Sequence, residues 1–489
     1  MLRRIAALLC CLALASCSPS DGGGPLGIAF IGEPDGLFQQ GVRLTPGAQH
    51  LRAATYEGLV ALDPAGQVVP ALAERWIVTD DGMSYIFRLR DSEWPDGELI
   101  TAGDVRVLLR DAIAQLRGTA LGLDLAKVAE VRAMTERVIE IRLTAPMPDF
   151  LRLLAQPELG FARRGSGAGP MVFARDDEAR AARLSALPPE ARGLPARENW
   201  EALSRPLVVR ALPAERAVRA FANGEVDLVL GGRIADFPLA RVGPLSRGTI
   251  QVDPAIGLLG LAIVNDRGLL ADPARREALS MAIERSALIQ PFGLGGWQPT
   301  SWIVPPALFT EPPYPPARWE ELSLAQRRAI AAGRIAAWRA QNGGTARVRL
   351  ALPPGPGSDL LYQQLAGAWA EIGVETLRVS PADDADLELR DALARFASPR
   401  WFLNQFHCSL RVGLCSPQAD ALVRQSLAER DVDAKERLLA EAHAALVAAE
   451  VFIPLGAPVR WSLVRGSVRG YQANQWGLHP LFPLSQPDN

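Results

Sequence analysis

Strand-like and helix-like patterns alternate along this chain, and this alternation restricts the possible fold more than any other feature of the sequence. Residues 208–212 and 226–230 are short apolar runs typical of buried strands. Residues 215–223, between them, have helical spacing, and Gly224 follows where a helix would stop. Strands separated by helices favour an α/β fold, because the connecting helices cover the faces of a largely parallel sheet.

The same pattern continues into the second half of the chain. Strands are predicted at 258–264 and 347–352, and helices at 272–289, 361–372 and 427–450. The first of these helices begins with an Asp-Pro pair, which suits an N-cap followed by the first helical position. A chain of this length should hold two or three domains, and its 48% hydrophobic content is enough for real cores.

The N-terminus has the features of a targeting segment. Arg3 and Arg4 precede the apolar stretch 5–15, which is too short to span a bilayer, and the stretch ends in Leu-Ala-Ser-Cys. We therefore expect residues 1–17 to be a lipoprotein signal peptide ending at a lipidated Cys17; an ordinary signal peptide is the alternative. Residues 18–26, rich in Gly, Ser and Pro, are predicted to be a flexible tether. The rest of the chain is then a domain held outside the cytoplasm by a lipid anchor in a bacterial membrane.

Two cysteines remain if Cys10, Cys11 and Cys17 are removed or acylated. Cys408 and Cys415 lie seven residues apart, and in an oxidising compartment such a pair most simply forms a local disulfide. A metal site is the alternative, but it would need more ligands, and the chain has only four histidines. We expect no metal and no cofactor.

The charge balance gives no reason to expect nucleic acid as a partner. The formal net charge is −2, and it becomes −4 when the two N-terminal arginines leave with the signal peptide. A surface this close to neutral lacks the basic patch that binds phosphate backbones.

One stretch is unusually specific in its local architecture. "SEWPDGELITAGDV", residues 92–105, reads as a turn at 95–97, a resumed strand at 99–100 and a helix start. Thr101 and Asp104 have the spacing of a capping box, in which each side chain accepts from the other residue's backbone N–H. The stretch contains no reactive side chain, so we interpret it as scaffold.

Several stretches together resemble the large peptide/nickel-binding family (family 5) of solute-binding lipoproteins that serve ABC importers. The similarity runs in the same order along nearly the whole mature chain. It is carried by residues 55–105, "GAGPM" at 167–171, "AVRAFANGEVDLV" at 217–229, residues 272–289, "QQLAGAWAEIGVE" at 363–375 and "FIPLG" at 452–456.

The resemblance implies a two-lobed periplasmic-binding-protein fold with a ligand cleft and a hinge. Lobe I would comprise residues 27–260 and 455–489, including a subdomain at 55–165, and lobe II residues 261–454. It also implies that the lobes close on a small or peptide-like ligand and that the closed form is presented to the permease subunits of an ABC transporter. We expect a monomer.

The chain departs from the family in the second lobe. Peptide binders carry Trp-x-Ala-Asp-Tyr-Pro-Asp-Pro there, and the first Asp pairs with the peptide's α-amino group. In the matching stretch, 392–406, Arg395 replaces that Asp, Phe396 the Tyr and Ser398 the second Asp. A cation at this position disfavours a buried ammonium and suits a carboxylate. We therefore predict that the protein does not bind ordinary peptides by their N-terminus and that its ligand is anionic; the alternative is that Arg395 faces solvent.

Further candidates for ligand contact lie in stretches that the resemblance places near the cleft. Each has an alternative role in packing, in the core or at the hinge. They are Trp297, Trp302, Trp401, Tyr56 and Glu57, with Asn474, Gln475 and Trp476 ranked lower.

Two other classes of function remain as alternatives. A cell-envelope enzyme would need a nucleophile with a positioned base, and the sequence has neither Gly-x-Ser-x-Gly nor His-Glu-x-x-His. We therefore expect no catalytic residues. A binding lipoprotein without a transporter, acting as a sensor or scaffold, is the second alternative.

Overall fold

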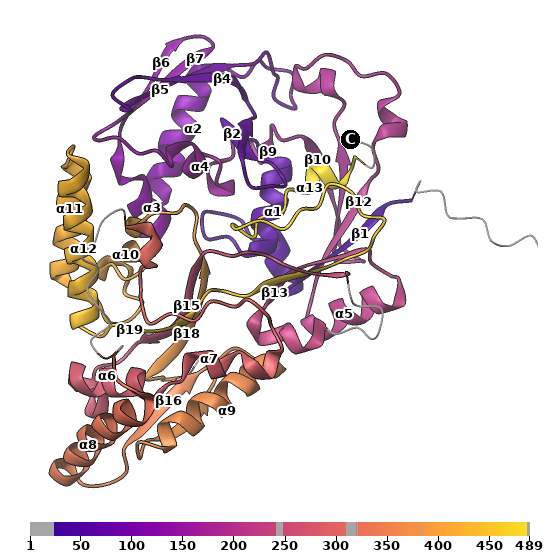
Figure 1. Cartoon of the computed structure of the whole chain (residues 1–489). Helices are drawn as coiled ribbons and strands as arrows, with labels where there is room; N and C mark the ends of the chain where they lie inside the picture. Colours follow the sequence, from indigo (N-terminus) through magenta and orange to yellow (C-terminus); the bar gives the residue numbers. More distant parts are fainter. Residues whose placement is uncertain (1–23, 241–247, 310–318, 320, 382, 487–489) are drawn as a thin grey trace, which may run out of the picture.

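The computed structural model describes residues 24–240, 248–309, 319, 321–381 and 383–486, and these residues are arranged around three main β-sheets (Figure 1). Cys17 and most of the predicted tether lie outside the described residues. The end of the tether prediction is wrong, because Leu26 is buried and begins the first strand.

The largest sheet has seven strands in the order β10-β11-β12-β1-β13-β20-β14. Its centre is parallel, with β1 between β12 and β13, and both flanks are antiparallel. The strands are β1 (Leu26–Ile31), β10 (Met171–Asp176), β11 (Ala181–Ala186), β12 (Leu207–Leu212), β13 (Leu228–Arg233), β14 (Ile250–Val252) and β20 (Arg460–Val464).

A second, five-stranded sheet has the order β17-β16-β18-β15-β19. Its strands are β15 (Gly257–Ile263), β16 (Arg347–Ala351), β17 (Glu375–Val379), β18 (Leu387–Leu393) and β19 (Phe452–Gly456). A four-stranded antiparallel sheet, at the top of Figure 1, has the order β4-β5-β7-β6. Its strands, with four short ones nearby, are β2 (Val60–Leu62), β3 (Val68–Pro70), β4 (Ala73–Val78), β5 (Ser84–Leu89), β6 (Val128–Thr135), β7 (Val138–Leu143), β8 (Ala162–Arg163) and β9 (Ser166–Gly167).

Helices cover these sheets and connect their strands. They are α1 (Pro46–Thr55), α2 (Ala102–Gln115), α3 (Ala120–Asp124), α4 (Phe150–Leu154), α5 (Ala214–Asn223), α6 (Pro273–Ala282), α7 (Arg285–Leu288), α8 (Leu324–Asn342), α9 (Pro356–Ala370), α10 (Pro399–Asn404), α11 (Pro417–Ala428), α12 (Val432–Ala448) and α13 (Leu481–Leu484). No helix within the described ranges is long and apolar enough to cross a membrane.

Strands from the start, middle and end of the chain share the seven-stranded sheet, whereas the five-stranded sheet is built from one continuous insertion. The fold is therefore two-lobed: the seven- and four-stranded sheets form the first lobe, and the five-stranded sheet with α6 to α12 forms the second. The predicted boundaries at 260 and 454 fall inside β15 and β19, both of which pair entirely within the second sheet. The chain crosses between lobes at 253–256 and 457–459 instead.

The helix ends follow local chemistry, which the sequence partly revealed. Thr101 Oγ1 accepts from the Asp104 N–H at 3.2 Å, and Asp104 Oδ2 accepts from the Thr101 N–H at 3.0 Å, so the predicted capping box is present. Gly224 ends α5 with a φ of 80°, a conformation that glycine adopts without steric cost. The strand predicted at 99–100 is only an isolated bridge between Glu93 and Leu99.

Two helices predicted as continuous are interrupted. The helix expected over 272–289 ends at Ala282, because the buried Arg285 side chain donates to the carbonyl oxygens of Ser280 and Pro454 at 3.2 and 2.8 Å. The helix expected from 427 to 450 is split into α11 and α12, since Asp431 caps a new helix by accepting from the Ala434 N–H at 2.7 Å.

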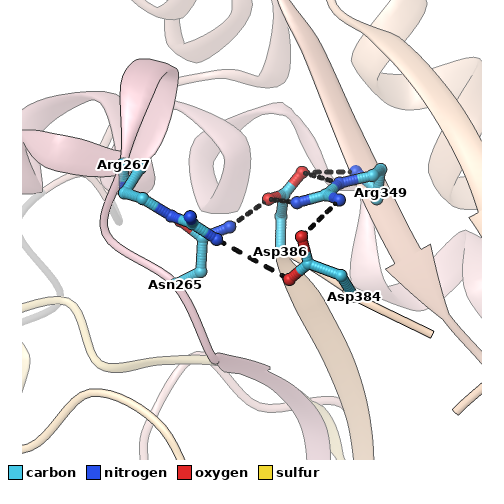
Figure 2. Close-up of polar contacts among 5 residues, drawn as sticks. All are labelled: Asn265, Arg267, Arg349, Asp384 and Asp386. Atoms are coloured by element: carbon cyan, nitrogen blue, oxygen red, sulfur yellow. Dashed lines mark hydrogen bonds and ion pairs between the residues drawn. The ribbon is translucent and has the colours of Figure 1, made fainter. Parts of the chain in front are cut away.

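A polar network ties together the three central strands of the second sheet, β16, β18 and β15 (Figure 2). Arg349 on β16 contacts Asp386 and Asp384, just before β18, at 3.0 and 2.8 Å. Asn265, which follows β15, donates to the same Asp386 carboxylate, and Arg267 lies 3.6 Å from Asp384. These contacts fix the positions of β15, β16 and β18 relative to one another, and β18 carries part of the site described next.

Candidate functional site

Two cavities meet between the lobes, where β13 of the first lobe and β18 of the second lobe both end. The smaller has a volume of about 300 Å³ and the larger about 950 Å³. Arg233, Asp391 and Ala392 line both, so the cavities are neighbours along one interlobe cleft. The smaller is lined by Leu44, Pro46, Gln49, His50, Leu62, Gln156, Pro157, Gly231, Arg233, Asp391, Ala392, Leu393, Ala394, Arg395, Arg460, Trp476, Gly477 and Leu478.

Arg395 reaches across this cleft to the first lobe. Its Nη2 lies 2.8 Å from Glu158 Oε1, and its Nη1 donates to Glu158 Oε2 at 2.9 Å and to Gln156 Oε1 at 2.7 Å. Gln49 donates to the same Glu158 carboxylate at 3.0 Å. Burial alone would raise the pKa of Glu158, but the charge and hydrogen bonds of Arg395 lower it, so the pair is ionised.

A second arginine of the cavity wall also has a carboxylate partner. Arg460 Nη1 lies 2.6 Å from Asp391 Oδ1, and both side chains are buried, with exposures of 9% and 8%. This pair joins β20 of the first lobe to β18 of the second. Two arginine–carboxylate pairs therefore neutralise charge across the cleft: Arg395 with Glu158, and Arg460 with Asp391.

Arg233 is different from these two arginines. It stands directly opposite Arg460 in the β13–β20 ladder, and its backbone oxygen accepts from the Trp461 indole N–H at 2.9 Å. Within the described part of the chain, its guanidinium makes no hydrogen bond or ion pair with a protein group. Burial lowers the pKa of Arg233 and the nearby Asp391 charge opposes this, but an arginine remains a cation at neutral pH.

The remaining wall of the small cavity is mainly apolar and uncharged. Burial lowers the pKa of His50 to about 3, so its ring is neutral. That ring has defined partners: Nδ1 lies 2.6 Å from the Pro46 carbonyl oxygen, and Nε2 accepts from the His479 N–H at 3.0 Å. The Trp476 ring, covered by Arg152 at 4.2 Å, supplies the largest flat apolar surface.

Comparison with known proteins shows which family has this architecture. The sequence model of bacterial extracellular solute-binding proteins, family 5 (middle), matches residues 67–392, which is most of the chain. The chain belongs to this family. It is 26% identical over 471 residues to a probable di/tripeptide-binding protein 5 of Pseudomonas aeruginosa, covering 84% of this chain and 86% of that protein.

Solved structures agree on the fold of this family-5 solute-binding protein. The murein tripeptide binding protein MppA of Escherichia coli superposes with a TM-score of 0.78 at 19% identity, covering 94% of this chain and 98% of that one. Haemophilus influenzae OppA, in complex with the peptide RPPGFSPFR, gives a TM-score of 0.76 at 17% identity, with coverages of 95% and 99%.

The three candidate residues that follow Arg395 in the sequence lie in different surroundings. Phe396 is 1% exposed and packs in the core under the Arg400 guanidinium, so it does not line either cavity. Ser398 precedes α10, and its side chain makes no capping bond and lies outside the cavity linings. Trp401 is also buried, but it lines a pocket of about 260 Å³ that shares Arg395 and Leu393 with the cleft.

The two other tryptophan candidates pack away from the cavities of this solute-binding protein. Trp297 donates its indole N–H to the Ala457 oxygen at 2.8 Å and lies flat against Gly456, at the crossing between lobes. Trp302 stacks on His443 of α12, with ring centroids 5.7 Å apart. Both therefore have the packing role that was the alternative to ligand contact.

Tyr56 and Glu57 do not reach the interlobe cleft. Tyr56 lines a separate cavity of about 540 Å³ on the first lobe, where its hydroxyl lies 3.4 Å from the Gly165 oxygen. Glu57 is 6% exposed, and its carboxylate forms a buried ion pair with Arg90. In this structure Glu57 neutralises Arg90 inside the first lobe.

Of the three C-terminal candidates, two make hydrogen bonds within the protein and one lines the small cavity. Asn474 is buried and donates to the Pro64 and Leu478 oxygens at 3.2 and 3.0 Å, and the Gln475 oxygen accepts from the Ile256 N–H at 3.1 Å. Only Trp476 of the three lines the small cavity. Cys408 and Cys415 form the predicted disulfide, and no metal-holding group of His, Cys, Asp or Glu occurs among the described residues.

Sequence reasoning missed Arg233, Asp391, Arg460 and Glu158. A signal for Arg233 was present, since this charged residue directly follows the uncharged run "LVLGG" of residues 228–232. In open α/β sheets, ligands bind in the crevice outside the carboxyl ends of the strands, and Arg233 stands at such an end. For Glu158 no comparable signal existed, because only the folded chain brings it beside Arg395.

Proposed function

We propose that this protein captures a small solute between its lobes by closure and presents it to an ABC importer. The observation that carries the proposal is the position of the small cavity, whose walls come from β13 and β20 of one lobe and from the end of β18 of the other. A ligand touching both walls favours the closed state, because those contacts are lost when the lobes separate.

We further propose that peptides are not held by their free α-amine. The names of relatives refer to di/tripeptides and to a murein tripeptide, so peptides are the natural comparison. The sequence resemblance aligns Arg395 with the family's amine-binding Asp, and this supports the proposal. Both oxygens of the nearby Glu158 already accept from Arg395, and Asp391 is held by Arg460. Among the described residues, both carboxylates at the small cavity therefore already have an arginine partner, which disfavours an added ammonium.

Two measurements test the proposal. Native mass spectrometry of protein purified without added ligand should show a retained solute, and small-angle scattering should show expansion when that solute is removed. Calorimetry should show no preference for trialanine over N-acetyl-trialanine. Micromolar binding of trialanine that acetylation abolishes would contradict the amine part, whereas absence of any solute and of any change in size would contradict capture.

We also propose that Cys17 is acylated and anchors the protein to the membrane. Replacement of Cys17 by Ala should move the protein from the detergent phase to the aqueous phase on Triton X-114 partitioning. Retention of the variant in the detergent phase would contradict the anchor.

A further inference from the structure

The small interlobe cavity contains one positive charge more than its carboxylates can neutralise. Three arginines line it, and two of them are paired: Arg395 with Glu158 and Arg460 with Asp391. His50 adds no charge, since burial keeps its ring neutral. Arg233 is therefore the one arginine of this lining without a carboxylate paired to it among the described residues.

The position of Arg233 is unfavourable for the ligand-free protein. Arg233 and Arg460 face each other directly in an antiparallel ladder, and like charges in this arrangement destabilise a sheet. The backbone next to Arg233 packs closely on Trp461: a Cβ at Gly232 would lie 2.2 Å from the indole ring, and the indole N–H donates to the Arg233 oxygen at 2.9 Å. An anion between the lobes would remove this repulsion.

The volume and the lining residues of the cavity indicate the chemical class of that anion. Its volume of about 300 Å³ is at the lower end for small-molecule sites. Seven larger apolar side chains are among the residues that line it; they are Leu44, Pro46, Leu62, Pro157, Leu393, Trp476 and Leu478. A guanidinium binds a carboxylate through two parallel hydrogen bonds, and apolar walls favour a hydrocarbon body.

We propose that Arg233 is the ligand's anion subsite and that the solute is a small monocarboxylate with an apolar body. This rests on the proposed function, because it assigns the ligand class of the same cleft. Arg395, which the sequence suggested for this role, instead holds the lobes together through Glu158. Asp236, on the wall of the larger cavity, attracts Arg233 electrostatically but makes no ion pair with it among the described residues.

The test uses straight-chain acids from butanoate to decanoate, each compared with its own primary amide, at low salt. At least one acid should bind the full-length protein about tenfold or more tightly than its amide, because only the acid pairs with a guanidinium. Arg233→Gln should remove that difference. Arg110→Gln, which deletes an exposed arginine on α2, is the matched control. It should leave the ratio of acid to amide affinity within about twofold of the wild-type ratio.

A second readout separates a binding role from a merely structural one. Without any acid, Arg233→Gln should melt at the same temperature as the wild type or higher, since it removes the repulsion with Arg460. Equal binding of acids and amides, or acid binding that survives Arg233→Gln, would overturn the subsite. In either case a solute retained in native mass spectra would still support capture, whereas wild-type protein with no retained solute and no acid binding would overturn both proposals.

Discussion

Arg395 and Glu158, which are 237 residues apart in the chain, form a doubly hydrogen-bonded ion pair that connects the two lobes at the mouth of the cleft. The Glu158 side chain is 1% exposed and that of Arg395 25%. Solvent therefore screens the charge of Arg395 in part but hardly reaches Glu158. Removal of either side chain leaves the charge of the other poorly compensated.

Breaking this pair should destabilise the protein measurably. Glu158→Gln and Arg395→Gln should each lower the free energy of unfolding by about 1–3 kcal/mol, and the double variant should lose less than the sum of both. The exposed pair Arg88–Glu74 provides the control, and Arg88→Gln should cost about 0.5 kcal/mol or less. Urea denaturation measures these values; additive losses would show that the two side chains are not coupled.

The same pair gives a direction to the pH dependence. Since Arg395 holds the pKa of Glu158 below its usual value despite burial, this stabilisation is present above the unfolded-state pKa of 4.5. It is lost as the pH falls through the folded-state pKa. Glu158→Gln should therefore reduce the loss of stability that the wild type shows on acidification below about pH 4.5.

Asp124 should have the opposite pH dependence. Burial raises its pKa to about 7, against the effect of Arg400 and of the Asn404 amide, which donates at 2.7 Å. Between pH 3.8 and 7 the folded carboxyl keeps a proton that the unfolded one has lost, so stability falls as the pH rises. Asp124→Asn should add about 1–3 kcal/mol at pH 8 and little at pH 4.

The control for this effect is Asp111→Asn, on the exposed surface of α2. This substitution should leave the free energy of unfolding unchanged at both pH values. Thermal or urea unfolding at the two pH values makes the comparison. A stability difference that stays the same at both pH values would contradict the assignment to Asp124 titration.

His443 is buried, and in the described structure neither of its ring nitrogens has a hydrogen-bond partner. Burial lowers its pKa to about 4, so protonation opposes folding as the pH falls from 6.5 toward 4. His443→Phe keeps the stacking on Trp302 and removes two unpaired nitrogens. We expect the variant to retain more of its pH 7.5 stability at pH 5 than the wild type does; parallel losses would contradict this explanation.

The disulfide between Cys408 and Cys415 closes a short loop near β15, where the Leu414 N–H donates to the Ile263 oxygen at 2.7 Å. Replacing both cysteines by serine should lower the free energy of unfolding by about 2–3 kcal/mol, the loop-entropy estimate for so small a ring. Reduction of the wild type with dithiothreitol should have the same effect and is the control. An unchanged unfolding midpoint in both experiments would show that the loop is held by its other contacts.

The sequence alone determined the α/β class, the family, the capping box at Thr101 and Asp104, and the disulfide. The family came from a resemblance of several stretches in the same order, and the other features depend on neighbouring residues or on periodic patterns, which a linear chain displays directly. The continuity of helices was less well predicted, because a buried Arg285 and a capping Asp431 interrupt segments whose apolar spacing continues through them.

Only the tertiary structure decided which charges of the cleft are free. The sequence resemblance suggested that Arg395 takes the place of the family's Asp, but the sequence could not show that Glu158 of the other lobe pairs with Arg395. It also gave no sign that Arg233 faces Arg460 across a ladder formed by strands more than 200 residues apart. Electrostatic interactions depend on distances in space and on burial, and in a two-lobed fold both are set by which distant segments the chain brings together.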